Sequence, residues 1–199
     1  MKKSFPKADA IKIAPVSGDS QLDEILQLQQ SNLALSLDEK EIQEQGFVTV
    51  QHDFATLKDM HAEAPSIVAL DEQRVVGYAL VMPASFRNKI PVLVPMFNMI
   101  DALEYLHYPL PSFTYFVMGQ VCIAKDYRGH GIFGLLYDGL KREYASCYRL
   151  LITEVASRNK RSINAHLRVG LKVIHRYTDP FGETWELMLL DWHATGKSA

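Results

Sequence analysis

The order of secondary-structure patterns after Tyr115 constrains the fold more than any other feature of this sequence. Two apolar runs are typical of buried strands, and each is followed by a segment whose apolar residues recur at helical spacing. A final pair of strand-like runs surrounds a turn rich in Asp, Pro and Gly. In chain order, the strands are expected at 115–124 and 150–155, the helices at 131–145 and from Ser157 or Asn159 to Gly170, and the hairpin around 179–182. Strand, helix, strand, helix and hairpin together predict a mixed α/β fold.

The first half of the chain predicts a sheet preceded by helices. Strands are expected at 10–16, 66–70 and 74–82, and helices at 21–35, at 38–45 and from a cap at Asp53 to Pro65. Residues 83–114 contain five prolines and one expected helix near 97–106. This insert either shapes a pocket or is a packed connection. Its candidate pocket residues are Asp101, Glu104, Tyr105 and Tyr108.

Length and charge exclude several classes of protein. With 199 residues, we expect one domain, 1–199, with a core over about 10–192. The formal net charge of −2 argues against a general nucleic-acid binder. No apolar run is long enough to span a bilayer and the N-terminus has no signal-peptide pattern, so we expect no membrane partner and a cytoplasmic location. Neither Cys122 and Cys147 nor the seven histidines show metal-ligand spacing, so no metal is expected.

A glycine-rich turn lies between the strand at 115–124 and the helix that follows it. Its residues are Arg128, Gly129, His130, Gly131, Ile132, Phe133 and Gly134. A turn of this kind leaves the first N–H groups of the helix without intrahelical partners, and the helix dipole adds a favourable potential for anions. Arg128 adds a forked cation. These residues predict diphosphate binding, and a purely structural turn is the alternative.

The same glycines also satisfy the dinucleotide fingerprint G-x-G-x-x-G, and Glu154 stands where its ribose-binding acid is expected. We reject this interpretation. Four residues separate the strand from the first glycine, and too little chain follows Gly134 for further parallel units.

Two blocks of sequence resemble the GNAT N-acetyltransferase superfamily. The first is the coenzyme signature R/Q-x-x-G-x-G/A, matched by Arg128 and Gly131, with Phe133 at the third position and Gly134 one place later. The second is N-x-x-A/S-x-x-x-Y-x-x-x-G-F, for which this chain has Asn159, Ser162, His166, Gly170 and Leu171. The resemblance covers most of residues 10–192.

The resemblance implies a mixed, mostly antiparallel sheet in which two central parallel strands, 115–124 and 150–155, splay apart, with helices on both sides. It implies that acetyl-CoA is the co-substrate. Its pantetheine would lie along Val121, Cys122 and Ile123, its diphosphate on the amides of 129–134 beside Arg128, and its thioester end near Asn159 and Ser162. The start of a basic stretch without acids would suit the coenzyme's 3′-phosphate. Its basic residues are Arg158, Lys160, Arg161, Arg168, Lys172 and Arg176. A solvated face or an RNA-binding face is the alternative.

Direct attack by an amine on the thioester requires an acceptor for the amine proton. Glu154, near the end of the second splayed strand, is the candidate base, and pairing with Arg158 or Arg161 is its structural alternative. His166 stands at the family's proton-donor position, although a buried structural histidine is equally compatible. Cys122 is expected to be a buried hydrophobe rather than a nucleophile.

The predicted function is an N-acetyltransferase that transfers acetyl from acetyl-CoA to a primary amine of a small molecule or a peptide, in a ternary complex. The alternative is a non-catalytic acyl-CoA-binding or sensing module on the same fold, because the usual tyrosine is replaced by His166. By analogy with relatives, a homodimer is possible.

Overall fold

The computed structural model describes residues 11–33 and 47–194. The strands are β1 (Ile11–Pro15), β2 (Ile67–Asp71), β3 (Arg74–Pro83), β4 (Glu104–Tyr105), β5 (Tyr108–Pro109), β6 (Tyr115–Ile123), β7 (Leu150–Ala156), β8 (Lys172–Thr178) and β9 (Thr184–Asp191). The helices are α1 (Asp19–Gln30), α3 (Phe54–Glu63), α4 (Val94–Ala102), α5 (Ile132–Tyr144) and α6 (Lys160–Arg168). Single 3-10 turns occur at Ala84–Phe86, Pro91–Leu93, Leu110–Ser112 and Lys125–Tyr127.

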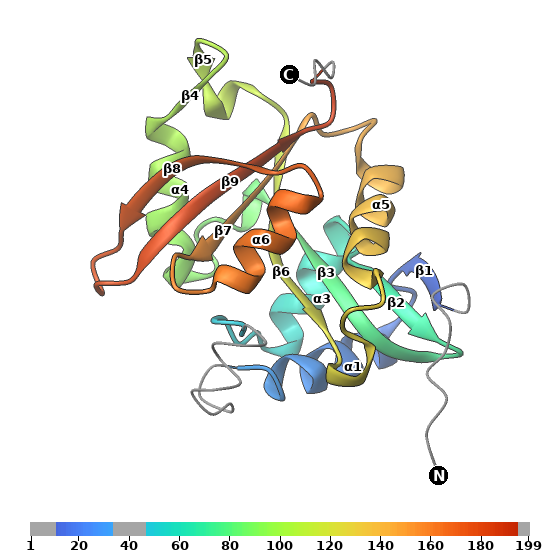
Figure 1. Cartoon of the computed structure of the whole chain (residues 1–199). Helices are drawn as coiled ribbons and strands as arrows, with labels where there is room; N and C mark the ends of the chain where they lie inside the picture. Colours follow the sequence, from blue (N-terminus) through green and yellow to red (C-terminus); the bar gives the residue numbers. More distant parts are fainter. Residues whose placement is uncertain (1–10, 34–46, 195–199) are drawn as a thin grey trace.

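Seven strands form one sheet in the order β1-β2-β3-β6-β7-β9-β8 (Figure 1). Strands β6 and β7 pair in parallel, and the other neighbouring strands of this sheet pair antiparallel. The mixed, mostly antiparallel sheet predicted from the sequence is therefore confirmed, including its central parallel pair.

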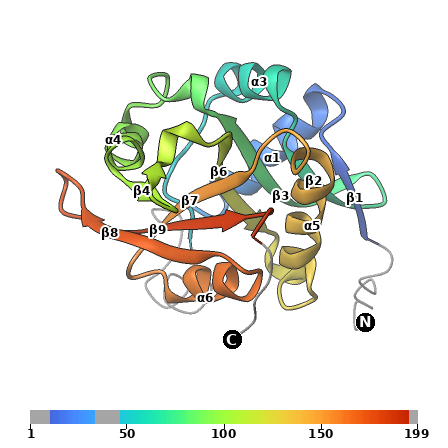
Figure 2. The ribbon, with the colours of Figure 1, turned by 90° about the horizontal axis from the view of Figure 1, so that it is seen from above.

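Helices cover both faces of the sheet, as Figure 2 shows from above. Helices α5 and α6 lie on one face, where Leu136 and Ile163 pack with Phe116 and Leu151. Helices α1, α3 and α4 lie on the opposite face, over two further apolar clusters. The helices thus hold the central strands between two apolar layers, and the strand ends are fixed in place.

The parallel pair is short, and the sheet opens beyond it. Only three residue pairs join β6 to β7, from Tyr115 with Leu150 to Val117 with Ile152. At the point of separation, Thr153 Oγ1 donates a hydrogen bond of 2.8 Å to the carbonyl oxygen of Met118. The register between β3 and β6 shifts next to this point and leaves Gly119 unpaired across from β3. The two predicted strands therefore splay as expected.

Two predicted helices differ from the observed ones at their ends. The helix predicted to reach residue 35 ends at Gln30, and Leu33 forms a bridge with Val48. The helix predicted near 97–106 is α4, which lies earlier and ends at Ala102, because Leu103 is extended with φ −98° and ψ 156°. Further along, Leu106 and His107 adopt positive φ values of 53° and 67°. That conformation closes the small β4–β5 hairpin and is incompatible with a right-handed helix. The helix expected at 38–45 lies outside the described residues.

Capping explains where α3 begins. Asp53 Oδ1 accepts a hydrogen bond of 2.8 Å from the amide of Thr56, as predicted for a cap at this position.

Within the described residues, no helix is long and apolar enough to cross a membrane.

Candidate functional site

A cavity of about 680 Å³ lies where β6, the glycine turn and α6 meet. Eleven of the twelve residues predicted to bind the coenzyme line it. They are Val121, Cys122, Ile123, Arg128, Gly129, Gly131, Ile132, Phe133, Gly134, Asn159 and Ser162. His130, the twelfth, is exposed and does not line the cavity. The structure therefore brings two blocks that are distant in the sequence to one site, and their contact with coenzyme stays a prediction.

The glycine turn has the backbone conformation of an anion cradle. Gly131 is the N-cap of α5 with φ +80°, and Gly129 has φ +82°. These left-handed conformations favour glycine. A Cβ atom at either position would meet no atom of the described residues within 4 Å, so the turn faces space that these residues leave open. The first amides of α5 lie beside this space without intrahelical acceptors, which suits an anion.

Contacts to Ile123 and Asn32 help to hold Arg128 at this turn. Its Nε donates a hydrogen bond of 2.9 Å to the carbonyl oxygen of Ile123, and its Nη2 donates one to Asn32 Oδ1. Asn32 is buried and lines the same cavity. Sequence analysis missed Asn32 because it is far from Arg128 along the chain and belongs to no motif.

Helix α6 presents one polar face to the cavity. Arg161, Asn164, Ala165 and Arg168 line it at intervals of three and four residues. This periodicity, extended from Asn159 and Ser162, would have found them. No Asp or Glu occurs among the described lining residues, whereas Arg128, Arg161 and Arg168 do. The cavity is therefore suited to an anionic ligand.

Three of the predicted coenzyme residues are buried, namely Cys122, Ile132 and Asn159. Ile132 packs into the core beneath α5. Cys122 is also buried, and burial raises the pKa of its thiol to about 11. A thiol with that pKa is protonated at neutral pH, which fits the expected structural role.

A smaller hollow of about 60 Å³ lies in the opening between β6 and β7. Glu154 and His166 both line it, together with Phe47, Gln120, Thr153 and Trp185 among others. Tyr177 donates a hydrogen bond of 2.5 Å to Glu154 Oε2. Burial raises the pKa of Glu154 to about 7, although the Tyr177 hydrogen bond opposes the rise. A carboxyl group with this pKa can accept a proton near neutral pH.

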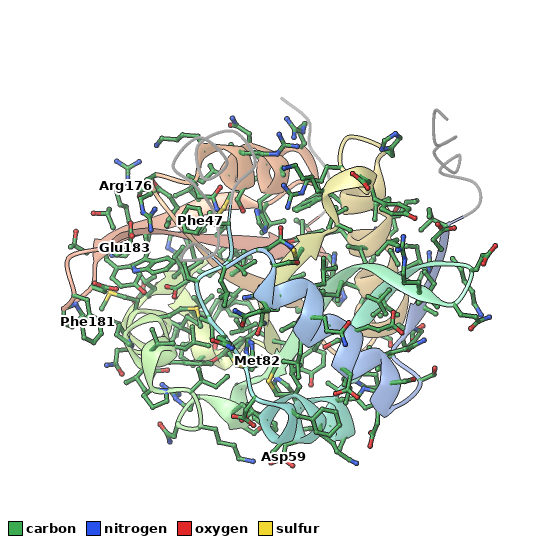
Figure 3. All side chains as sticks on the ribbon, turned by 90° about the horizontal axis from the view of Figure 1, so that it is seen from below. Phe47, Asp59, Met82, Arg176, Phe181 and Glu183 are labelled. Carbon is green, nitrogen blue, oxygen red and sulfur yellow. The ribbon has the colours of Figure 1, made fainter. Side chains whose placement is uncertain are left out.

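Of the alternative partners considered for Glu154, Arg158 is occupied elsewhere. Its Nε donates a hydrogen bond of 2.9 Å to Glu183 Oε2. Its guanidinium also lies 4.3 Å from the ring centroid of Phe47. Figure 3 shows Phe47 and Glu183 on the same side of the molecule. Phe47 is further bound through its carbonyl oxygen, which accepts a hydrogen bond of 3.2 Å from Asn159 Nδ2.

His166 is buried, with 1% of its surface exposed. Its Nδ1 lies 2.7 Å from the carbonyl oxygen of Ser162, which can only accept, so Nδ1 bears the ring proton. Burial lowers the pKa of His166 to about 4. The ring is therefore neutral at pH 7, and its buried Nε2, which has no hydrogen-bond partner among the described residues, is an acceptor. The predicted proton-donor role of His166 would require a different protonation state from this one.

The four insert residues expected near the acceptor lie away from both hollows. Asp101 pairs with Arg87, and Tyr105 donates a hydrogen bond of 3.2 Å to Asp191. Glu104 and Tyr108 are exposed on the small hairpin. The insert instead packs an apolar cluster under the sheet. Of the two interpretations left open for the insert, the packed connection agrees with this cluster, and none of the four residues lines either hollow.

Residues 11–33 and 47–194 contain no group of three His, Cys, Asp or Glu side chains arranged to hold a metal ion.

A mixed sheet that opens beyond its parallel pair, with a helix N-terminus at the opening, is the architecture of GNAT acetyltransferases. The sequence matches the acetyltransferase (GNAT) family over residues 24–171, and the chain belongs to this family. No curated protein sequence gives a significant match.

Solved structures of acetyltransferases share this fold at low sequence identity. The ribosomal-protein-S18-alanine N-acetyltransferase from Escherichia coli aligns with a TM-score of 0.60 and 13% identity, covering 95% of this chain and 98% of the other. Ard1 from Thermoplasma volcanium gives 0.62 and 14%, covering 92% and 97%. YncA from Salmonella typhimurium, a putative acetyltransferase solved with acetyl-CoA, gives 0.59 and 15%, covering 96% and 99%.

Proposed function

We propose that this protein transfers an acetyl group from acetyl-CoA to a primary amine. One observation carries the proposal: a cavity suited to an anion adjoins a hollow between β6 and β7 that is lined by a carboxyl group of raised pKa. The two hollows share the lining residues Phe47, Val48, Val121, Asn159 and Ser162 and therefore adjoin each other.

The described residues fit the coenzyme. The open space before Gly129 and Gly131 suits a diphosphate, and the amides that begin α5 would bind it. Arg128 and Arg161 would hold further phosphate oxygens, and the edge of β6 from Val121 to Ile123 would bind the pantetheine arm. When bound, the coenzyme supplies an acetyl thioester for attack by an amine.

Glu154 would accept the proton that the amine loses. An amine must be neutral to attack, and a carboxylate placed beside it removes the proton directly or through water. Its pKa of about 7 keeps a large fraction ionised at neutral pH while allowing it to hold a proton. Tyr177 keeps one of its oxygens in a fixed position.

The acceptor should carry no anionic group next to its amine. The described residues around the smaller hollow include Glu154 but no Lys or Arg. A free amino acid would place its carboxylate beside Glu154 without a cation to compensate, which is unfavourable. A peptide amine or an uncharged alkylamine has no such penalty. The Escherichia coli neighbour named for ribosomal protein S18 alanine acts on a protein amine.

The test is release of coenzyme A thiol when the protein is incubated with acetyl-CoA and a panel of peptides and small amines. We expect release with at least one acceptor and a loss of roughly 10² or more in the turnover rate of Glu154→Gln. The same variant should keep the thermal stabilisation by acetyl-CoA, because Glu154 does not line the coenzyme cavity. Stabilisation by acetyl-CoA without thiol release from any acceptor would favour the non-catalytic binding module.

A further inference from the structure

The C-terminal hairpin reaches the candidate site from outside the segment that matches the family. The match ends at residue 171, and β8 and β9 follow it. Nevertheless, Trp185 lines the smaller hollow and Tyr177 contacts Glu154. Both contacts come from the hairpin of β8 and β9.

The register of the sheet explains how Tyr177 reaches Glu154. Tyr177 pairs with Trp185, and Trp185 pairs with Ala156 on β7. Paired residues share a face of the sheet, and Glu154 and Ala156 share a face because they are two residues apart. The Tyr177 side chain therefore crosses over β9, and its hydroxyl meets Glu154 Oε2 at 2.5 Å.

We propose that Tyr177 is a positioning residue for Glu154, holding one carboxylate oxygen so that the other faces the opening between β6 and β7. This inference rests on the proposed function, in which Glu154 accepts the amine proton. The Tyr177 hydroxyl keeps its proton and remains a hydrogen-bond donor, because burial and the neighbouring Glu154 raise its pKa well above the ordinary range. A donor of this kind favours the ionised form of the carboxyl group.

Few other titratable groups bear on Glu154. Asp179 lies near enough to raise the pKa of Glu154, and it is fixed by a hydrogen bond of 2.9 Å from Trp185 Nε1. His166, on α6, lines the same hollow and is neutral. Arg176 and Glu186, also on the hairpin, pair with each other. Tyr177 is therefore the described group that opposes the effects of burial and Asp179.

The variant Tyr177→Phe removes the hydroxyl and keeps the ring. We expect the pKa of Glu154 to rise by about one unit, because a hydrogen bond to a charged group is lost. The measurement is the titration of ¹³C-labelled glutamate carboxyl groups by NMR, with Glu154→Gln identifying the signal. Tyr105→Phe is the matched control, since it also removes a tyrosine-to-carboxylate hydrogen bond, to Asp191, away from both hollows. In this control the Glu154 signal should not move.

The pH profile of kcat/KM tests the functional part of the proposal. In Tyr177→Phe, the acid limb of this profile should move to higher pH by the same amount as the pKa of Glu154. The variant should therefore be less active than the wild type at pH 7 and regain activity near pH 9. An unmoved Glu154 titration, or a moved titration with an unmoved limb, would overturn the proposal. Normal titration in a wild type that acetylates no amine would overturn the proposed function instead. If Tyr177→Phe does not fold, as judged by circular dichroism, Tyr177→Met removes the same hydroxyl and must shift the titration in the same direction.

Discussion

The guanidinium of Arg128 donates a hydrogen bond to the side-chain oxygen of Asn32, and so joins the end of α1 to the turn that begins α5. Asn32 is itself fixed by a hydrogen bond of 2.8 Å from its Nδ2 to the carbonyl oxygen of Leu28. An N-terminal helix, far from the coenzyme signature in sequence, thereby orients the cation of that signature. If Arg128 binds the coenzyme as proposed, Asn32 is expected to be a positioning residue for that binding.

Asn32→Ala should therefore weaken acetyl-CoA binding about tenfold, as expected for loss of a charge-assisted hydrogen bond. Isothermal titration calorimetry with acetyl-CoA gives the dissociation constant directly. Asn98→Ala, on the exposed side of α4, is the control and should bind as the wild type does. An unchanged constant in Asn32→Ala would show that Arg128 needs no support from α1.

Gly131→Ala should lose both stability and coenzyme affinity. Its φ of +80° makes a Cβ atom unfavourable, at a cost of about 1 kcal/mol in the free energy of unfolding. The added Cβ would also project into the open space before the turn, where the diphosphate is proposed to bind. We expect a rise of at least about tenfold in the dissociation constant of acetyl-CoA.

Gly170→Ala separates these two effects. Gly170 has φ +96° at the end of α6, and its Cβ would make an ordinary contact with Leu190 at 3.5 Å. Urea unfolding should show a similar loss of stability in both variants, whereas only Gly131→Ala should bind acetyl-CoA more weakly. Equal binding by both variants would argue against a diphosphate at Gly131.

The sequence was sufficient where local patterns decide the structure. The Asp53 cap, the strand that became β6 and the glycine turn all depend on neighbouring residues, and each lies where it was predicted. Helix periodicity also placed Asn159 and Ser162 on one face of a helix, and both line the larger cavity. These features required no knowledge of the tertiary structure.

Long-range contacts were not predictable from such patterns. Asn32 meets Arg128 and Tyr177 meets Glu154 only after the sheet has assembled, and neither Asn32 nor Tyr177 stands in a motif. The same reason applies to the smaller hollow. Proline and aromatic content suggested that the insert would shape a pocket, yet Trp185 of the C-terminal hairpin lines this hollow. The neutral state of His166 could not be predicted from the sequence alone, because it depends on burial of the side chain.

His166 should remain neutral down to acidic pH, with its proton on Nδ1. Long-range ¹H–¹⁵N NMR spectra should show this tautomer between pH 8 and pH 5, because the pKa is lowered from 6.5 to about 4. The lowered pKa favours the folded state above pH 6.5, and this contribution is lost as the pH falls through about 4. Between pH 7.5 and 4.5, the wild type should lose about 2 kcal/mol more than His166→Gln in urea unfolding. A charged imidazole at pH 7 would contradict this assignment and restore the proton-donor role.

Glu154 shows the opposite pH dependence. Its pKa is raised from 4.5 in the unfolded chain to about 7, so the folded state disfavours the ionised carboxyl group. This group is most compatible with the fold below pH 4.5, and the cost of ionising it grows until the pH exceeds about 7. Glu154→Gln cannot ionise, so its stability relative to the wild type should be higher at pH 8 than at pH 5 by on the order of 2 kcal/mol. Urea unfolding of both proteins at the two pH values measures this difference. A gain in stability at pH 8 together with a loss of turnover would show that the fold keeps a destabilising carboxylate for its chemistry, whereas equal stability at both pH values would mean that Glu154 titrates as an ordinary surface acid.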